Sequence, residues 1–195
     1  MEKNFSAHLA QTLRQKRSLT LREIENEFGE KGFAIIFLVL MALPALPIPT
    51  GGVTHIFEIV VMLLALELIA GRKSIWLPRR WRTKTIPPSL QASKTLQTLI
   101  RFIQKVETIS RPRFRQGLQT KNVLRAIGFV AFVFTLFAFL APPFSGLDTL
   151  PSLGVVLLSL GLVFEDAVVG LVGVIVGAIG IGLVLLLGRV VVQLF

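Results

Sequence analysis

Four ionisable side chains lie within apolar stretches of this sequence and are the residues most able to do chemistry: His55, Glu58, Glu67 and Asp148. His55 and Glu58 are three positions apart, so on a helix they would share a face and could form an ion pair or pass a proton. Ionisable groups inside apolar, membrane-type segments are costly and usually mark a pathway or an internal pair. We therefore predict that these four residues belong to a binding site.

A plainer structural role is also open for members of this set. His55 and Glu58 follow a turn, where water or lipid headgroups would solvate them, and the sequence favours neither interpretation. Glu67 lies about one helical turn before Arg72 and Lys73 and could simply pair with one of them. The binding-site hypothesis therefore requires that the fold bring these residues close together.

The recognisable catalytic motifs are missing from the chain. No P-loop, GxSxG, HExxH, CxxC or dinucleotide-binding fingerprint occurs. There is no cysteine, which excludes thiol chemistry and Cys-based metal sites, and the two histidines are His8 and His55. We therefore expect no catalytic residue, no metal site and no cofactor.

A Pro- and Gly-rich stretch, Leu43–Gly52, interrupts an apolar run that otherwise continues from 32 to 70. Prolines cannot donate a hydrogen bond inside a helix, and glycines accept the backbone angles of tight reversals. A second break occurs at Leu140–Gly146, so the sequence predicts two Pro-broken helical hairpins. The turn residues would be Pro44, Pro47, Pro49, Gly51 and Gly52 in the first hairpin and Pro142, Pro143 and Gly146 in the second.

The two hairpins align without a gap when residues 33–70 are moved by 94 positions onto residues 127–164. Matches at the proline and glycine positions of the break indicate an internal duplication. The arms of the first hairpin are predicted at Gly32–Pro49 and Val53–Ala70, and those of the second at Ala126–Pro142 and Leu147–Phe164. An arm of about 18 residues would measure roughly 27 Å, enough to cross a hydrocarbon core of ~30 Å and also short enough for a re-entrant hairpin. The shift superimposes Pro49 on Pro143, Gly52 on Gly146, Thr54 on Asp148 and His55 on Thr149.

Basic residues are concentrated between the two hairpins. Residues 71–125 hold 14 of the 21 Lys and Arg residues against one acid, Glu107, whereas residues 126–188 hold none. The positive-inside rule then places the N-terminus and this linker in the cytoplasm. We expect anionic lipids, and not nucleic acid, as the partners of this charge, because it flanks apolar spans. The residues expected to contact headgroups are Arg72, Lys73, Trp76, Arg79, Arg80, Trp81 and Arg82.

The remaining segments predict amphipathic helices over 5–29 and 90–110 and an apolar span over 167–187. Glu165 and Asp166, directly before this span, are expected to form a turn and a helix start, because acids suit a helix N-terminus. Gly173 and Gly177 form a GxxxG step, which lets another helix approach closely. We expect this step to pack within the chain, and a homodimer through the Gly-rich helix is the alternative.

The sequence therefore predicts an all-α integral membrane protein. It would contain two repeated Pro-broken hairpins, spanning or re-entrant, a Gly-rich C-terminal transmembrane helix and cytoplasmic amphipathic helices. The predicted divisions are an N-terminal amphipathic segment (1–31), the first hairpin (32–70), a basic linker with an interfacial helix (71–125), the second hairpin (126–164) and the C-terminal membrane helix (165–195).

Three segments, GFAIIFLVLMALPALPIPTGG, LLALELIAGRKSIWLPRR and FAFLAPPFSGLDTLPSLGVVLLSLGLVFEDAVVGL, resemble the ExoD-type exopolysaccharide-synthesis family of bacterial membrane proteins. The resemblance covers roughly residues 18–188. Glu67 stands where a glutamine is commoner, and His55–Glu58 occupies a segment usually more apolar. Membership would imply a bacterial inner-membrane protein linked to exopolysaccharide production, and it implies no catalytic residue.

Two functions follow from these expectations. In the first, the hairpins enclose a cavity that transports or handles a phosphorylated lipid or polysaccharide precursor, as interrupted helices do in transporters. In the second, the chain is a non-catalytic scaffold or regulator of an exopolysaccharide assembly. A membrane enzyme is the weakest reading. Transport predicts polar groups that converge between the hairpins, whereas a scaffold predicts an apolar interior.

Overall fold

The computed structural model describes residues 6–7, 11, 31–46, 54–72, 94–111, 113, 120–142 and 145–194, and every regular element in these ranges is helical. This confirms the all-α expectation. The helices are α3 (Gly32–Met41), α4 (Thr54–Ile69), α7 (Lys94–Ile109), α9 (Lys121–Leu140), α10 (Thr149–Phe164) and α11 (Ala167–Leu194).

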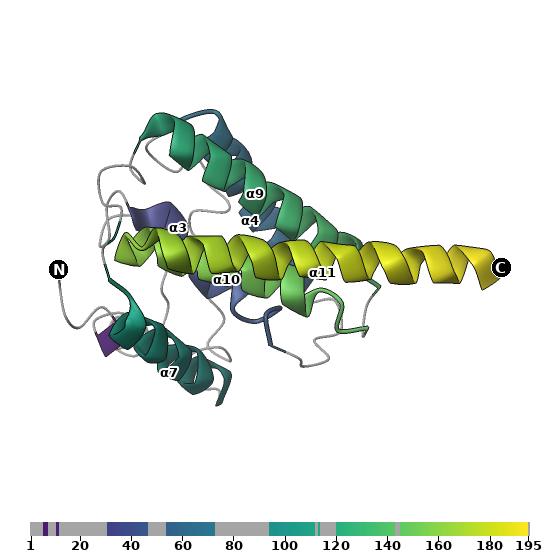
Figure 1. Cartoon of the computed structure of the whole chain (residues 1–195), viewed down its shortest axis with the longest axis horizontal. Coiled ribbons are helices and arrows are strands. Elements are labelled where there is room, and N and C mark those ends of the chain that lie inside the picture. The colour runs from purple at the N-terminus through teal and green to yellow at the C-terminus, as the bar shows by residue number, and fades with distance from the viewer. Residues whose placement is uncertain are drawn as a thin grey trace.

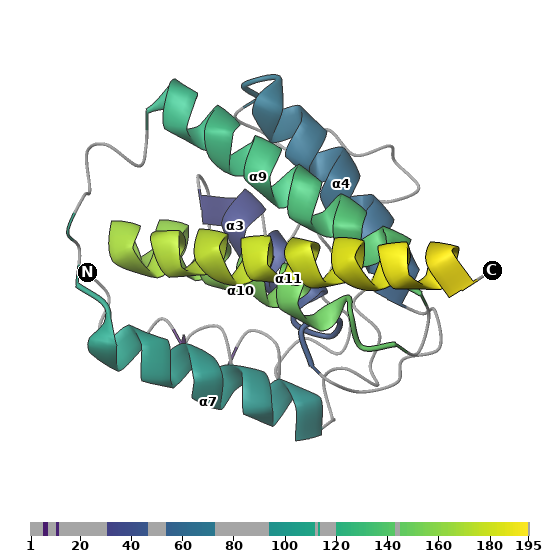
Figure 2. The same cartoon turned by 45° about the vertical axis from the view of Figure 1, so that its right-hand side comes forward.

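Two antiparallel helix pairs enclose a short central helix (Figures 1 and 2). One pair is α10 with α11 and the other is α4 with α9. The central helix, α3, packs on α10 and α4, and all ten of its residues are buried. The linker side of the bundle holds the beginnings of α3, α9 and α11 and the ends of α4 and α10. We call this the basic end, and the side where α4 and α10 begin the turn end.

The first apolar arm is shorter as a helix than the expected 32–49 segment. α3 ends at Met41, and the chain turns through Ala45. Pro44 has no N–H to donate to the carbonyl of Leu40, and its ring disfavours a helical backbone at the residue before it. At ten residues α3 measures about 15 Å, half of a ~30 Å hydrocarbon core.

The other arms follow the expectation more closely. α4 and α10 begin and end within two residues of the predicted arms. α9 begins at Lys121, five residues earlier than the predicted second hairpin, and so includes the last basic residues of the linker. α11 continues past 187 to Leu194. Long basic side chains can lie along an apolar helix with their charges beyond it, which allows α9 to start among them.

Glycines bring α10 and α11 into backbone contact. A Cβ built on Gly154 of α10 would lie 2.6 Å from the Cα of Gly177, and one on Gly161 would lie 2.6 Å from the Cα of Gly170. A Cβ on Gly173 would lie 2.6 Å from the backbone nitrogen of Leu158. The predicted GxxxG step therefore faces α10 of the same chain. A homodimer stays a prediction and would use another face of α11.

The helices α4 and α10 end in the same way, at positions 94 apart. Gly71 follows α4 with φ 77°, and Glu165 follows α10 with φ 57°. In each case the next residue donates its N–H to a carbonyl five positions back, Arg72 to Glu67 at 3.1 Å and Asp166 to Gly161 at 2.8 Å. This is the Schellman arrangement, in which a left-handed residue satisfies the last helical carbonyls.

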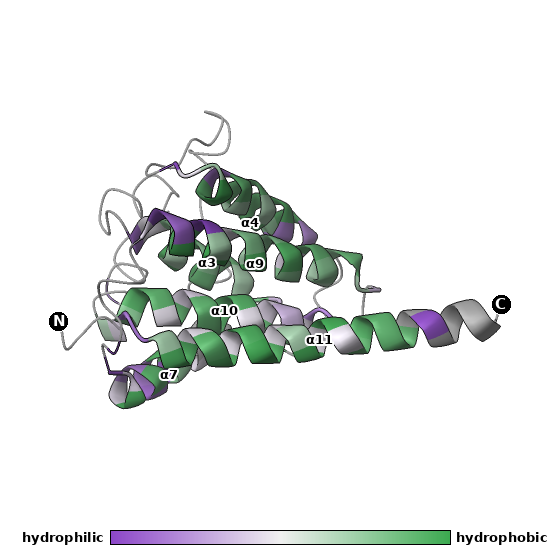
Figure 3. Cartoon of the chain, turned by 45° about the horizontal axis from the view of Figure 1, so that its top comes forward, coloured by the Kyte–Doolittle hydropathy of each residue, from purple (hydrophilic) through white to green (hydrophobic). Residues whose placement is uncertain are grey.

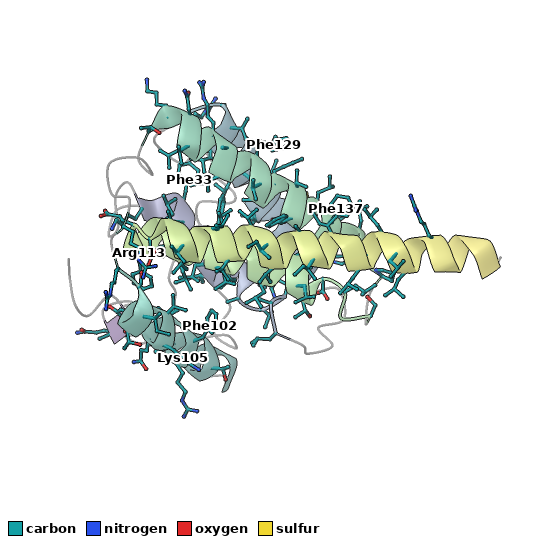
Figure 4. The ribbon with its side chains drawn as sticks, in the orientation of Figure 1. Phe33, Phe102, Lys105, Arg113, Phe129 and Phe137 are labelled. Carbon is teal, nitrogen blue, oxygen red and sulfur yellow. The ribbon has the colours of Figure 1, made fainter. Side chains whose placement is uncertain are left out.

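α7 lies beside the bundle, apart from the two helix pairs (Figures 1 and 2). Ile100 and Ile103 are buried, and Phe102 packs against the core from the side of α7 that faces the bundle (Figure 4). The N–H of Ser6 donates to Glu107 at 3.2 Å. Of the predicted N-terminal amphipathic helix, only residues 6, 7 and 11 lie within the described ranges, and all three are helical.

In the described part of the chain, two helices are long and apolar enough to cross a membrane, by length and composition. They are Lys121–Leu140, with mean hydropathy 2.3, and Ala167–Leu187, with mean hydropathy 2.8. We call these two stretches the apolar windows of α9 and α11. Only 28% of the first and 22% of the second is buried inside the protein. Figure 3 shows that most residues of the two helices are apolar, and Phe129, 60% exposed, points outward from α9 in Figure 4. A core helix of a soluble protein would instead be mostly buried.

Candidate functional site

Polar side chains gather at the turn end, where α4 and α10 begin. α4 contributes Thr54, His55 and Glu58 from its first turns, and α10 contributes Asp148, directly before the helix, and Ser152 from its first turn. Both helices start after a predicted Pro/Gly break, so the break sets where these side chains lie. Thr54, Glu58 and Ser152 are buried, although the surrounding segments are apolar.

The centre of this site is the carboxylate of Glu58, which is 0% exposed. The Nδ1 of His55 lies 3.0 Å from its Oε2. The two groups are not aligned as a hydrogen bond, and neither oxygen of Glu58 has a hydrogen-bond partner among the described residues. The ring of His55 packs on that of Phe139, with centroids 5.0 Å apart, so α9 forms one wall of the site.

The structure brings three of the four predicted residues together. Asp148 lies close enough to Glu58 for its negative charge to act on that carboxylate. His55 in turn acts electrostatically on Asp148. Their joint role in binding stays a prediction. Glu67 is not part of it, because it lies nine residues along α4 from Glu58, about 14 Å toward the basic end.

Sequence reasoning missed Ser152. Its side chain is 0% exposed, and its Oγ has no hydrogen-bond partner among the described residues. The signal was present in the sequence, since Ser152 is the residue that the shift of 94 positions superimposes on Glu58. The two hairpins thus each bury, at the same position, a polar side chain that has no hydrogen-bond partner among the described residues.

The depth of the site can be measured along α11. A Cβ built on Gly180 would lie 2.6 Å from the backbone nitrogen of Pro151, so Gly180 marks the level of Ser152. Gly180 is 13 residues from Ala167, about 20 Å, and the apolar window continues for seven residues, about 10 Å more, to Leu187. The polar start of α10 therefore lies about two thirds of the way along this window.

A second polar cluster lies at the basic end and has a structural role. Asp166, 1% exposed, accepts hydrogen bonds from the N–H of Val168 at 3.0 Å, the N–H of Arg111 at 2.9 Å and the hydroxyl of Ser110 at 3.2 Å. Burial by itself would raise the pKa of Asp166, but these hydrogen bonds and the charge of Arg113 outweigh it and lower the pKa below its ordinary value. Asp166 therefore caps α11 and ties the segment after α7 to it.

Lys31 stabilises the neighbouring turn. Its Nζ donates to the carbonyl oxygen of Val163 at 2.8 Å and lies 3.4 Å from Oε1 of Glu165. Arg113, 3.7 Å from Asp166, lies at the same end of the bundle (Figure 4). The acidic pair therefore forms the expected turn and helix start, and it also fixes this end of the bundle.

The described ranges hold only part of the other predicted sites. Gly146 has φ 69°, as a turn glycine requires, and Arg72 follows α4 with an exposed side chain. Within these ranges no group of three His, Asp or Glu residues could hold a metal ion. The predicted residues that lie outside the described ranges are Pro47, Pro49, Gly51, Gly52, Pro143, Lys73, Trp76, Arg79, Arg80, Trp81 and Arg82.

The chain is similar to proteins of one family. The family described as "Exopolysaccharide synthesis, ExoD" matches residues 5–186. An uncharacterized protein of Synechocystis sp. is 30% identical over 142 residues, which cover 72% of this chain and 65% of that protein. The protein ExoD of Rhizobium meliloti (strain 1021) is 30% identical over 153 residues, which cover 76% of this chain and 62% of that protein.

The alignments thus span slightly less than two thirds of these relatives. No solved structure matches the chain. The family match covers nearly the whole sequence, including both predicted hairpins, the basic linker and the acidic pair. The chain belongs to the ExoD exopolysaccharide-synthesis family.

Proposed function

We propose that this chain is a bacterial inner-membrane protein that transports or handles a phosphorylated lipid or polysaccharide precursor in exopolysaccharide synthesis. Family membership supports a role in exopolysaccharide synthesis, and the relative from Rhizobium meliloti has the name of the family. The observation that carries the transport reading is the convergence of His55, Glu58 and Asp148 from two hairpins at one site. A scaffold would be expected to have an apolar interior there.

The outward faces of α9 and α11 support a place in the membrane, because they are apolar and mostly unburied. Charge supports the orientation. A group of Lys and Arg residues of the described ranges lies at the basic end, which the positive-inside rule puts in the cytoplasm with the N-terminus, whereas Arg189 lies past the apolar stretch of α11. α11 runs from that end past the turn end, so its C-terminus would lie on the opposite side. These basic residues include Lys31, Arg72, Arg113, Lys121 and Arg125.

The lengths of the helices favour re-entrant hairpins. α3 is about 15 Å long and α10, with 16 residues, about 24 Å, whereas the hydrocarbon core is ~30 Å thick. The level of Ser152, two thirds along the apolar window of α11, would then lie inside the membrane. A polar site at that depth costs free energy, and a protein with a purely structural role would gain nothing from it. The matched breaks, the matched helix ends and the pair Glu58 and Ser152 support an internal duplication.

The two ends of the bundle suit different parts of a precursor. Arg72 and the basic linker would attract a phosphate group at the cytoplasmic surface. Glu58 and Asp148 would repel a phosphate but accept hydrogen bonds from sugar hydroxyl groups. Glu58 and Arg72 are 14 residues apart, roughly 21 Å along a helix, so one small headgroup cannot touch both. A substrate that used both would have to move between them, which is transport.

Complementation tests this proposal. A bacterial strain that lacks its own copy would receive wild-type protein, Glu58→Gln or Asp148→Asn, with secreted exopolysaccharide and membrane abundance measured together. Glu67→Gln is the matched control, because it removes a carboxylate from the same helix at the other end. We expect exopolysaccharide to fall in the first two variants and to stay normal in the control, at equal abundance. Normal secretion by all three would refute the site.

A direct binding measurement complements the genetic test. The purified full-length protein would be titrated with polyprenyl phosphates and, separately, with anionic phospholipids. Saturable binding of the polyprenyl phosphate above that of the phospholipid would identify the precursor class. Equal binding of both would indicate attraction to the headgroup charge alone.

A scaffold or regulator is the second candidate, and the Asp166 cluster favours it. Ser110, Arg111 and Arg113 of the linker attach to α11 through this one buried carboxylate. Such an attachment would present α7 to a partner in a fixed place. If this function is correct, Asp166→Asn would reduce exopolysaccharide while Glu58→Gln would not. The same complementation assay therefore separates the two candidates.

A further inference from the structure

We propose that Glu58 is a proton-binding site that His55 connects to the turn end of the bundle. This inference rests on the proposed transport function and names the ion that the same site would bind. The carboxylate of Glu58 is 0% exposed, and neither oxygen has a hydrogen-bond partner among the described residues. An ionised carboxylate in such a place loses its hydration and has only the imidazole of His55 beside it in exchange, which favours the neutral acid.

His55 provides the path to and from Glu58. Its Nδ1 is buried and lies 3.0 Å from Oε2 of Glu58, whereas 31% of its side chain is exposed. The exposed part is therefore the rest of the ring. It lies near the α9–α10 turn, where Ser145 and Gly146 are exposed. A proton can thus reach the imidazole from outside and leave it toward the carboxylate.

The charges around Glu58 come from few elements. His55 on α4 and Asp148 in the turn before α10 are the titratable groups that act on it. α3 contributes only apolar residues and glycine, and the described part of α9 beside the site contributes Phe139 and no charge. α10 has no titratable residue, and α11 has none before Arg189. Two carboxyl groups beside one imidazole give the site more acidic than basic groups, and a proton bound by one carboxylate reduces the negative charge.

A proton fits this site better than a metal ion. A metal ion needs several ligands around it, and no set of three His, Asp or Glu residues within the described ranges is placed to enclose one. A proton needs one carboxylate oxygen and one neighbouring group that can deliver it. Glu58 and His55 supply both.

The transfer is a simple relay. A proton from water bonds to Nε2 of His55 and makes an imidazolium. Once the ring turns to align its Nδ1–H with Oε2 of Glu58, 3.0 Å away, the proton on Nδ1 passes to that oxygen, which leaves a neutral imidazole and a neutral carboxylic acid. One proton has moved from water to Glu58, no electrons have moved, and the reverse steps release it.

Infrared spectroscopy tests this inference independently of transport. The full-length protein in vesicles of phosphatidylethanolamine and phosphatidylglycerol would be titrated between about pH 5 and pH 8. A protonated carboxylic acid has a C=O stretching band that its ionised form lacks. We expect a buried band that titrates reversibly, is lost in Glu58→Gln and remains in Glu67→Gln. In His55→Gln the band should remain, but its exchange with deuterium should slow by about a hundredfold.

The outcomes are distinct from those of complementation. If no band titrates, or if Glu58→Gln keeps the wild-type band, the proton site is refuted even if exopolysaccharide is lost. An unchanged exchange rate in His55→Gln would refute the relay. Should Glu58→Gln fail to fold, Glu58→Asp retains a carboxyl group and is expected to shift the frequency of the band. An unshifted band in that variant would also overturn the assignment.

Discussion

The contact between α10 and α11 gives a sharp test of the fold through the substitution Gly154→Ala. The new Cβ would lie 2.6 Å from the Cα and 2.8 Å from the nitrogen of Gly177, and 2.9 Å from the carbonyl oxygen of Gly173. Carbon atoms in contact are normally about 3.5–4.0 Å apart, so the helices would have to separate by roughly 1 Å. All three atoms belong to the backbone, so no side-chain rotation can relieve the contact.

The size of the effect follows from this geometry. Overpacking of a tight interface costs about 1–3 kcal/mol, and the melting temperature of a chain of this size changes by about 2–4 °C per kcal/mol. We therefore expect Gly154→Ala to melt roughly 2–12 °C below the wild type in detergent, measured by circular dichroism.

Gly182→Ala is the matched control for this substitution. A Cβ there would meet nothing within 4 Å. Removal of a glycine from a helix interior stabilises it by about 0.5–1 kcal/mol, so this variant should melt slightly above the wild type. If both variants melted at the same temperature, the close approach of α10 and α11 would be refuted. Chemical crosslinking of the same samples would show whether either substitution changes oligomeric state.

Three further predictions concern the Asp166 cluster, the orientation in the membrane and the first Pro-rich break. Because the pKa of Asp166 is lowered, its carboxylate stabilises the fold above about pH 4 and loses this effect as the pH falls through the folded-state pKa. Asp166→Asn should therefore lower the free energy of unfolding by about 1–3 kcal/mol at neutral pH. Denaturant titrations should show that the difference in stability between variant and wild type disappears in acid. In intact cells an impermeant thiol reagent should not label Gln104→Cys on the exposed side of α7, and labelling there would reverse the orientation. Replacement of Pro47 and Pro49 by leucine should reduce expression and exopolysaccharide, and full function of that variant would show that the break is dispensable.

The positions of α4 and α10 could be predicted from the sequence because local signals determine them. Each begins just after a proline- and glycine-rich break and ends where the apolar run meets polar residues. The predicted length of the first arm was wrong because the apolar composition continues to Pro49, whereas helix α3 ends at Met41. The apolar composition indicates that the segment is buried, but it does not indicate where the helical hydrogen bonds end.

The contacts of the Asp166 cluster could not be predicted in the same way. Ser110 and Asp166 are 56 positions apart, and nothing in either segment indicates that they meet. Their contact depends on where α7 lies, which the packing of several helices decides together. The cluster of His55, Glu58 and Asp148 could be predicted because the two breaks place its members at equivalent points of two similar hairpins.

The pair Glu58 and Ser152 connects the duplication to function. An unpartnered polar group in an apolar interior costs about 1–3 kcal/mol, and an apolar side chain of similar shape would remove that cost. Both hairpins nevertheless bury a polar side chain at this position, one a carboxylate and the other a hydroxyl. Packing alone gives no reason for such a choice. An ion or substrate that visits the site and temporarily satisfies these groups does give one.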